Sequence, residues 1–217
     1  MGEILQPGQK MNSGPTVFIV DDDPDLREWL RAVLELEGLR AEPFCSAEEF
    51  LQAFAPPCLG CVVADARAPQ MGGMELQARL ARMGQPVPLI LLTNYADVAM
   101  AVQAMKAGVA SVVEKPINRR LLLDAVGEVI AREAEHHAQV DQIVEIQSRI
   151  GSLTTRERQV LEMVTAGMAS KDIAVNLSVS RKTIDSHRAH IMKKMNAHSV
   201  AELVRLAIVS GTTRLLR

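Results

Sequence analysis

Between residues 16 and 114 the chain repeats one pattern, a short apolar run followed by apolar residues at helical spacing. Continuous apolar runs predict buried strands, and apolar residues three and four positions apart predict amphipathic helices. The expected strands cover residues 16–20, 39–44, 61–65, 87–93 and 110–114; the expected helices cover 24–37, 46–54, 74–83 and 97–107, with another from Asn118. This alternation predicts a parallel sheet with helices on both faces.

Chemically distinctive side chains stand at the ends of these strands. Asp21 and Asp22 follow the first strand, Asp65 ends the third, Thr93 ends the fourth and Lys115 follows the fifth. The carboxyl ends of parallel strands form one edge of a sheet, where ligands bind. Carboxylates from two strands suit Mg²⁺, Asp65 is then a candidate nucleophile toward a phosphoryl group, and Lys115 and Thr93 suit its oxygens. The alternative is a hydrated acidic edge with an ordinary ion pair.

After residue 150 the pattern changes to four short helical segments, which end near residues 166, 177, 195 and 209. Each begins at a capping residue: Thr154 with Glu157, Ser170, Ser180, and Ser199 with Glu202. The first and last of these have the spacing of a capping box. Three residues, 178–180, join the second and third segments, which is the spacing of a helix-turn-helix.

The third of these helices has an apolar stripe and a polar face. The stripe consists of Ile184, Arg188, Ile191 and Met195, and the opposite face carries Lys182, Asp185, Ser186, Ala189 and Lys193. Small and charged residues on a capped helix fit a DNA major groove. Arg181, Lys182 and Lys194 are candidates for phosphate contacts. A solvated basic face is the alternative.

Charge divides the chain near the same place. Residues 1–149 contain 13 Lys and Arg against 21 Asp and Glu, a net charge of −8, whereas residues 150–217 contain 11 against 5, a net charge of +6. The basic region favours a nucleic-acid partner. With 48% hydrophobic residues the chain is not wholly disordered, and it shows neither a secretory signal nor an apolar run that could cross a bilayer. We therefore expect a cytoplasmic protein without a membrane partner.

Two local features bear less on function. Residues 1–14 are polar and include Pro7, Gly8 and Gly14, so we expect a flexible tail. Cys58 and Cys61 form a single C-x-x-C. This motif leaves a redox or metal role open beside the simpler interpretation of Cys61 as a small buried hydrophobic residue.

Residues 15–130 resemble a response-regulator receiver domain, more narrowly of the FixJ-like branch. The resemblance lies in VFIVDDDPDLREWL, CVVADARAPQMGGMEL, LILLTNYADVAMAVQAMKAG and VVEKP. It implies a flavodoxin-like (βα)5 doubly wound parallel sheet, a phosphoacceptor at Asp65, and phosphoryl sensing by Thr93 and Lys115. The implied ligands of Mg²⁺ or Mn²⁺ are Asp21, Asp22, Asp65 and the backbone carbonyl of Arg67. The resemblance also implies a cis Lys115–Pro116 peptide bond.

Two positions depart from the receiver pattern. Val112 stands where Tyr or Phe is usual, three residues before the lysine. Asn94 follows the threonine where Gly or Ala is usual. In this family the aromatic residue helps to report phosphorylation to the surface, so we expect intact phosphoryl acceptance with an altered switch at Val112.

Residues 150–210 are similar to a LuxR/NarL-type helix-turn-helix along LTTRERQVLEMVTAGMASKDIAVNLSVSRKTIDSHRAHIMKKMNAHSVAELV. The resemblance implies an all-α, four-helix DNA-binding domain whose last helix supports dimerisation on inverted half-sites. The implied groove-facing residues are Lys182, Thr183, Asp185, Ser186, Arg188 and Ala189, while His187 packs or meets the DNA backbone. We expect domains at 15–130 and 150–217, joined by a helical linker over 131–149 that is either solvated or part of a coiled coil.

Together these features predict a transcriptional response regulator of a two-component system, whose output is not enzymatic. A sensor histidine kinase would phosphorylate Asp65, and a homodimer would then bind promoter DNA and act with RNA polymerase, usually as an activator. Two alternatives stay open. One is a haloacid-dehalogenase-type phosphatase, which would use Asp21 to Asp23 and leave Asp65 without a role. The other is a phosphorylation-independent DNA-binding regulator with a degenerate receiver.

Overall fold

The computed structural model describes residues 14–55, 59–84, 87–94 and 98–210. The chain divides into two compact units, residues 1–135 and 136–217. Apart from Gly14, the expected N-terminal tail lies outside the described residues. Within the described ranges no helix is both long enough and apolar enough to span a membrane.

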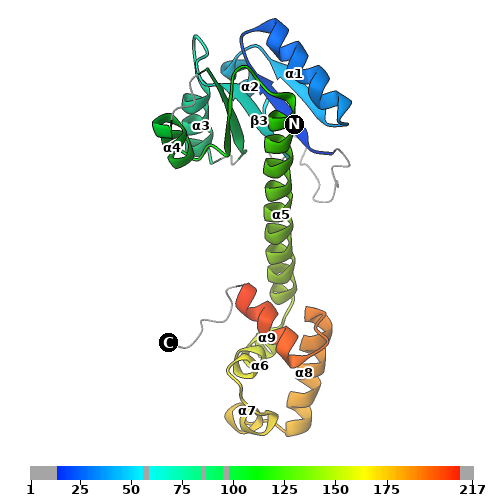
Figure 1. The fold of residues 1–217 in the computed structure, drawn as a ribbon. Coiled ribbons are helices and arrows are strands. Elements are labelled where there is room, and N and C mark those ends of the chain that lie inside the picture. The colour runs from blue at the N-terminus through cyan, green and yellow to red at the C-terminus, as the bar shows by residue number, and fades with distance from the viewer. Residues whose placement is uncertain (1–13, 56–58, 85–86, 95–97, 211–217) are drawn as a thin grey trace, which may run out of the picture. The chain divides into compact units, whose positions relative to one another are not determined.

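The first unit is built on a five-stranded sheet (Figure 1). Its strands are β1 (Thr16–Val20), β2 (Arg40–Phe44), β3 (Gly60–Asp65), β4 (Leu89–Thr93) and β5 (Ser111–Glu114). Every neighbouring pair is parallel, in the order β2-β1-β3-β4-β5. The predicted doubly wound sheet is thus confirmed, and its strand order changes direction at β1 and β3, where such sheets bind ligands.

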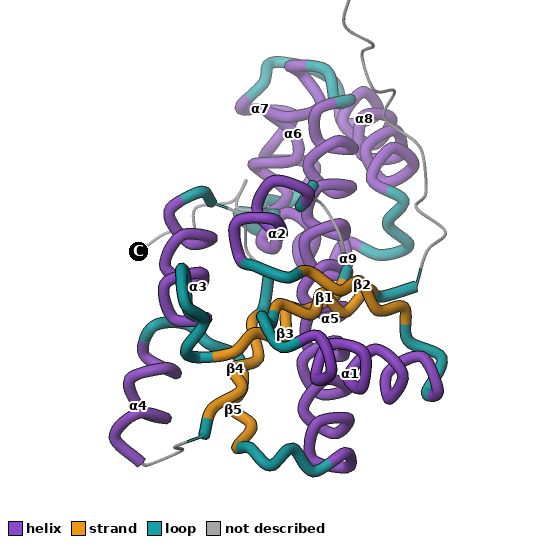
Figure 2. The backbone as a smooth tube through the Cα atoms, turned by 90° about the horizontal axis from the view of Figure 1, so that it is seen from above, coloured by secondary structure: helices purple, strands orange, loops and turns teal. Residues whose placement is uncertain are grey.

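Helices cover both faces of this sheet. They are α1 (Pro24–Leu36), α2 (Ala47–Ala53), α3 (Gly73–Arg82), α4 (Val98–Lys106) and the first part of α5 (Arg119–Gly151). One apolar core joins the sheet to α1 and α5, and a second joins it to α2, α3 and α4. Figure 2 shows α1 and α3 on opposite sides of the strands. Between their end residues, the strands β1, β3 and β4 are apolar on both faces because both faces of the sheet are covered.

Two adjacent glycines let α3 begin close to the end of β3. A Cβ atom on Gly72 would lie 2.3 Å from the carbonyl oxygen of Ala66, and one on Gly73 would lie 2.4 Å from Leu91 Cδ1. Neither distance is compatible with a side chain in a close-packed interior. These glycines therefore seat the β3–α3 loop directly beyond Asp65.

The described part of the second unit consists of helices joined by short turns. The last part of α5 packs with α6 (Thr155–Thr165), α7 (Ser170–Asn176), α8 (Arg181–Met195) and α9 (Val200–Val209) around one apolar core. Ile146 and Ile150 of α5 belong to that core, whereas Val140 and Val144 are exposed. A short turn joins α7 to α8, and Ser180 caps α8, so the predicted helix-turn-helix is confirmed.

Two predicted caps in this unit differ in detail. Ser170 is the first residue of α7 rather than its cap, and its Oγ lies 3.2 Å from Arg188 Nη1, which donates to it. At α9 the Ser199 Oγ accepts the N–H of Glu202, as predicted, but the Glu202 carboxylate accepts from the N–H of His198 at 2.9 Å. Sequence spacing alone cannot separate the predicted caps from the observed ones, because neighbouring residues offer equivalent backbone N–H groups.

The C-x-x-C motif has one described member. Cys61 is fully buried in β3, and burial raises the pKa of its thiol to about 12. A thiol that stays protonated is neither a good metal ligand nor a good nucleophile, so Cys61 acts as a small hydrophobic residue. Cys58 lies outside the described residues.

Candidate functional site

The sheet register brings the predicted polar residues together. Val20 pairs with Ala64 and Asp65 pairs with Leu92, so the residue after β1 and the last residue of β3 lie at one edge. The Thr93 carbonyl accepts from the backbone N–H of Lys115 at 2.7 Å, which extends the pairing of β4 and β5. Parallel strands in this register therefore place acids and a lysine around one point.

Lys115 bridges two carboxylates from different strands. Its Nζ donates to Asp65 Oδ2 and lies 3.4 Å from Asp21 Oδ2. Burial by itself lowers the pKa of Lys115, but the hydrogen bond to Asp65 and the charge of Asp21 outweigh burial and raise that pKa. The Lys115–Pro116 peptide bond is cis, as predicted.

Asp21 is the most buried acid of the site, with 2% of its surface exposed. Its Oδ1 accepts from the Asp23 N–H at 2.9 Å, and its backbone carbonyl accepts from Arg27 Nη1 at 2.6 Å. Burial raises the pKa of Asp21, and the hydrogen bond from Asp23 and the charge of Lys115 offset only part of this rise. The negative charge of Asp21 is therefore incompletely compensated.

The other residues of the site differ in exposure. Asp65 is partly buried, and its Oδ1 accepts from the Arg67 N–H at 2.7 Å. Thr93 is 3% exposed at the end of β4. Asp22 is exposed and borders a cavity of about 290 Å³ between the loops that follow β2 and β3. The structure thus joins Asp21, Asp65 and Lys115 directly and leaves Asp22 nearer to solvent.

Within the described ranges no three His, Cys, Asp or Glu side chains are arranged as a metal site. Lys115 occupies the position between Asp21 and Asp65 that a cation could share. The metal-ligand set with Asp22 and the Arg67 carbonyl therefore stays a prediction. Among the predicted ligands, Asp21 is the buried carboxylate whose negative charge a bound cation would help to balance.

The two departures from the receiver pattern lie beside this site. Val112 of β5 is partly buried and packs against the core shared with α4. Asn94 is exposed next to Thr93. A side chain packed in a core has little freedom to change position, so the packing of Val112 does not favour a rotation that reports phosphorylation.

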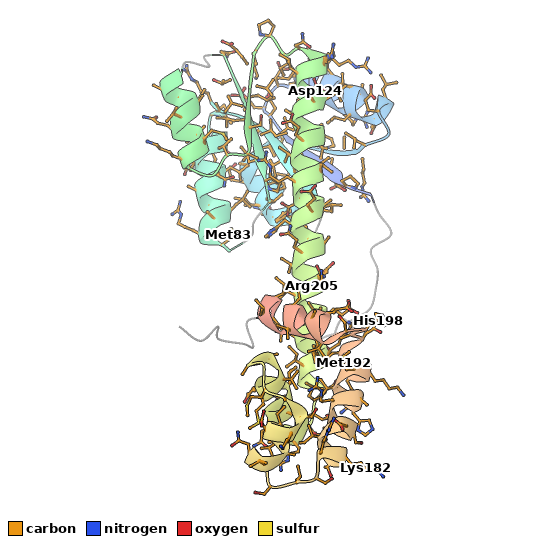
Figure 3. All side chains as sticks on the ribbon, turned by 60° about the horizontal axis from the view of Figure 1, so that its bottom comes forward. Met83, Asp124, Lys182, Met192, His198 and Arg205 are labelled. Carbon is orange, nitrogen blue, oxygen red and sulfur yellow. The ribbon has the colours of Figure 1, made fainter. Side chains whose placement is uncertain are left out.

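The two faces of α8 match the prediction. Ile184, Ile191 and Met195 are fully buried. The exposed residues are Arg181, Lys182, Thr183, Asp185, Ser186 and Ala189, while His187 and Arg188 are partly buried. Figure 3 shows Lys182 at the outer end of α8. The helix therefore presents a small, polar and basic surface, within which Arg181 Nε lies 3.7 Å from Asp185 Oδ2.

Lys194 is exposed as well, but its ammonium is engaged within the second unit. Its Nζ donates to Glu157 Oε2 at 2.7 Å and to the Ser152 carbonyl at 3.2 Å, near the other end of α8 from Lys182. Glu157 is 4% exposed, and the hydrogen bond from Lys194 lowers the pKa of that carboxyl to about 2. The structure engages Lys194 in an ion pair between α6 and α8, and its predicted phosphate contact stays a prediction.

Known proteins match both units. The family model of the response regulator receiver domain matches residues 17–127. The model of the luxR family of bacterial regulatory proteins matches residues 151–207. The first match contains the acids and Lys115 at the sheet edge, and the second contains α6 to α8 and most of α9.

The chain is also similar to curated proteins and solved structures over most of its length. The transcriptional regulatory protein FixJ of Azorhizobium caulinodans is 42% identical over 90% of this chain and 92% of its own. FixJ of Rhizobium meliloti is 41% identical over 90% of this chain and 96% of its own. The response regulator StyR has a TM-score of 0.82 at 39% identity, covering 89% of this chain and 98% of that chain. Full-length FixJ of B. japonicum has a TM-score of 0.57 at 35% identity, covering 94% and 100%.

Proposed function

The chain belongs to the FixJ-like response regulators, which join a receiver domain to a LuxR-type DNA-binding domain, and we propose that phosphorylation of Asp65 controls its DNA binding. It is a two-component transcriptional regulator. In our proposal a sensor histidine kinase supplies the phosphoryl group in the cytoplasm. Because both units match regulator families, the phosphatase alternative has no support.

One observation carries this proposal, the sharing of Lys115 between Asp65 and Asp21 at the sheet edge. In the transfer, an oxygen of Asp65 forms a bond to phosphorus while the nitrogen–phosphorus bond of the donor histidine breaks. Lys115 then leaves the Asp65 carboxylate and pairs with a phosphoryl oxygen, and the Thr93 hydroxyl donates to another. This exchange of partners converts modification of Asp65 into a local rearrangement.

The residues at the sheet edge fit Mg²⁺ or Mn²⁺. The Asp21 carboxylate is buried with its charge only partly offset, and carboxylate and carbonyl oxygens are the donors that these ions prefer. Asp21, Asp22, Asp65 and the Arg67 carbonyl would hold the ion. When bound, it would neutralise phosphoryl oxygens during transfer.

For the output we propose that the exposed surface of α8 enters the major groove. Thr183, Ser186 and Ala189 offer small contacts to base edges, while Arg181 and Lys182 lie near the helix start, where phosphates bind. Asp185 suits a cytosine amino group or excludes other bases. Phosphorylation favours a homodimer, which would bind inverted half-sites and act with RNA polymerase at the promoter.

A second candidate function is DNA binding that does not depend on phosphorylation. Val112 favours it, because this aliphatic side chain packs in the core where the family usually has an aromatic reporter. Asp65→Asn separates the two candidates. The second candidate requires equal DNA affinity in wild type and variant, whereas the first requires tighter binding by the phosphorylated wild type alone.

The test begins with acetyl phosphate and Mg²⁺, followed by intact mass measurement of wild type and Asp65→Asn. We expect one added phosphoryl group in wild type and none in the variant. The same samples are then compared for oligomeric state and DNA affinity. A wild-type chain that gains no mass would contradict the proposed phosphorylation of Asp65.

A further inference from the structure

We propose that Arg27 is a positioning residue for the divalent cation at the phosphorylation site. This inference rests on the proposed function and adds a residue to it. Arg27 lies in α1 and is partly buried. Its guanidinium contacts the backbone of Asp21 rather than the carboxylate, so it can hold Asp21 in place without occupying the oxygens that a cation needs.

The contacts of Asp21 show what Arg27 adds. The Asp21 N–H donates to the Phe44 carbonyl at 3.3 Å, and Oδ1 accepts from the Asp23 N–H at 2.9 Å. Both partners belong to the sheet or to the loop itself. The bond from Arg27 Nη1 to the Asp21 carbonyl, at 2.6 Å, ties that loop to the body of α1. A short bond from a charged, partly buried donor is among the stronger kinds of hydrogen bond.

Two effects of Arg27 on a bound cation oppose each other. Its positive charge repels the cation, whereas its hydrogen bond orders the backbone that carries Asp21 and Asp22. Repulsion between charges near solvent is weakened by water and salt. A carboxylate that is already ordered, by contrast, loses less conformational entropy when the cation binds. We infer that ordering dominates, so that loss of Arg27 weakens cation binding.

Arg31 supplies the matched control on the same helix. Its Nη2 lies 2.6 Å from Glu28 Oε1, and both side chains are substantially exposed, at 40% and 64%. Arg31→Met removes the same charge from α1 as Arg27→Met and keeps a similar apolar stem. A general effect of helix charge on the cation would therefore appear in both variants.

The experiment titrates Mg²⁺ alone into the full-length wild type, Arg27→Met, Arg27→Lys and Arg31→Met, followed by calorimetry and by tryptophan emission. Trp29 is the one tryptophan of the chain and borders a cavity with Lys115, so its emission is sensitive to charge beside that lysine. The unfolding temperature is recorded in parallel. Acetyl phosphate labelling at increasing Mg²⁺ separates the half-saturating concentration from the maximal rate.

We expect Arg27→Met to raise the Mg²⁺ dissociation constant about tenfold, the size of one charged hydrogen bond. Arg27→Lys keeps a charge and a single donor, so its constant should rise only about threefold. Arg31→Met should stay within about twofold of wild type, as exposed charges usually do. In the labelling assay, the half-saturating Mg²⁺ concentration should rise with the dissociation constant in the Arg27 variants and stay at the wild-type value in Arg31→Met.

Equal or tighter Mg²⁺ binding by Arg27→Met, compared with Arg31→Met, would overturn the inference. If Arg27→Met does not fold, Arg27→Lys decides the matter. Weaker Mg²⁺ binding at an unchanged unfolding temperature supports the inference, and unchanged binding overturns it. A wild-type chain that takes up neither Mg²⁺ nor a phosphoryl group would instead refute the proposed function, a result that is distinct from a difference between variants.

Discussion

Each unit of the molecule contains a lysine paired with a buried carboxylate, and the two pairs differ in how well their charges are balanced. Lys115 is shared between Asp65 and Asp21, and burial raises the pKa of Asp21. Lys194 contacts Glu157, whose pKa falls to about 2 because of that hydrogen bond. The balanced pair stabilises a fold, whereas the unbalanced pair suits a site that exchanges partners during function.

Breaking the unbalanced pair should have the largest effect. Lys115→Met removes the cation that Asp65 and Asp21 share and, in our proposal, one donor to the phosphoryl oxygens. Loss of one such donor typically slows a reaction at least about 100-fold. We expect the rate of acetyl phosphate labelling at saturating Mg²⁺ to fall by about this factor, as followed by intact mass over time.

The matched control is Lys194→Met, which removes a lysine with the same chemistry from the other unit. Its labelling rate should equal that of wild type. A rate for Lys115→Met within about threefold of wild type would show that Lys115 does not act on the phosphoryl oxygens, since one lost donor costs much more.

Breaking the balanced pair should act on stability instead. Lys194→Met leaves the buried Glu157 without its cation, so the free energy of unfolding of the second unit should fall by about 2 kcal/mol. Calorimetry of the full chain, with the two units resolved as separate transitions, measures this change. Adding Glu157→Gln should recover part of the loss, because the stranded charge is then gone. No loss in the single variant would show that solvent already screens the pair.

Acidification tests the same pair without a change at Lys194. The pKa of Glu157, about 2, lies below its ordinary value of 4.5. The ionised carboxylate therefore stabilises the second unit above about pH 4.5, and this contribution is lost as the pH falls toward about 2. We expect the unfolding temperature of this unit to fall over that interval, with a loss of roughly 1 kcal/mol. Glu157→Gln should flatten the dependence, and an equally steep profile in that variant would assign it to other groups.

The sequence predicts the edge of the sheet well because the rule that governs it is topological. Once the order of strands and helices is read from periodicity, parallel pairing brings Asp65 and Lys115 together whatever the details of packing. The convergence of those residues follows from the strand ends alone, and the structure differs from the expected strand boundaries by only one or two residues.

Packing partners are less accessible to this reasoning. Glu157 and Lys194 are 37 residues apart, and their pairing depends on how α6 lies against α8, which no local pattern specifies. Spacing identified Glu157 only as a capping residue, a role that it also fulfils. The contact of Arg27 could not be predicted for another reason: its partner is a backbone carbonyl, and every residue has one.

The smallest expected effect concerns the two ends of α8. Lys182 is exposed at the start of the helix, whereas Lys194 is engaged with Glu157 near its end. If Lys182 neutralises one phosphate, Lys182→Ala should weaken DNA binding about threefold on any sequence and lower the slope of log affinity against log salt by about 1. Fluorescence anisotropy at several salt concentrations measures both quantities. Lys194→Met, studied where it remains folded, should leave the slope unchanged because that ammonium already has a partner. The reverse result, a smaller slope for Lys194→Met alone, would mean that DNA competes with Glu157 for Lys194 and that the balanced pair is itself a switch.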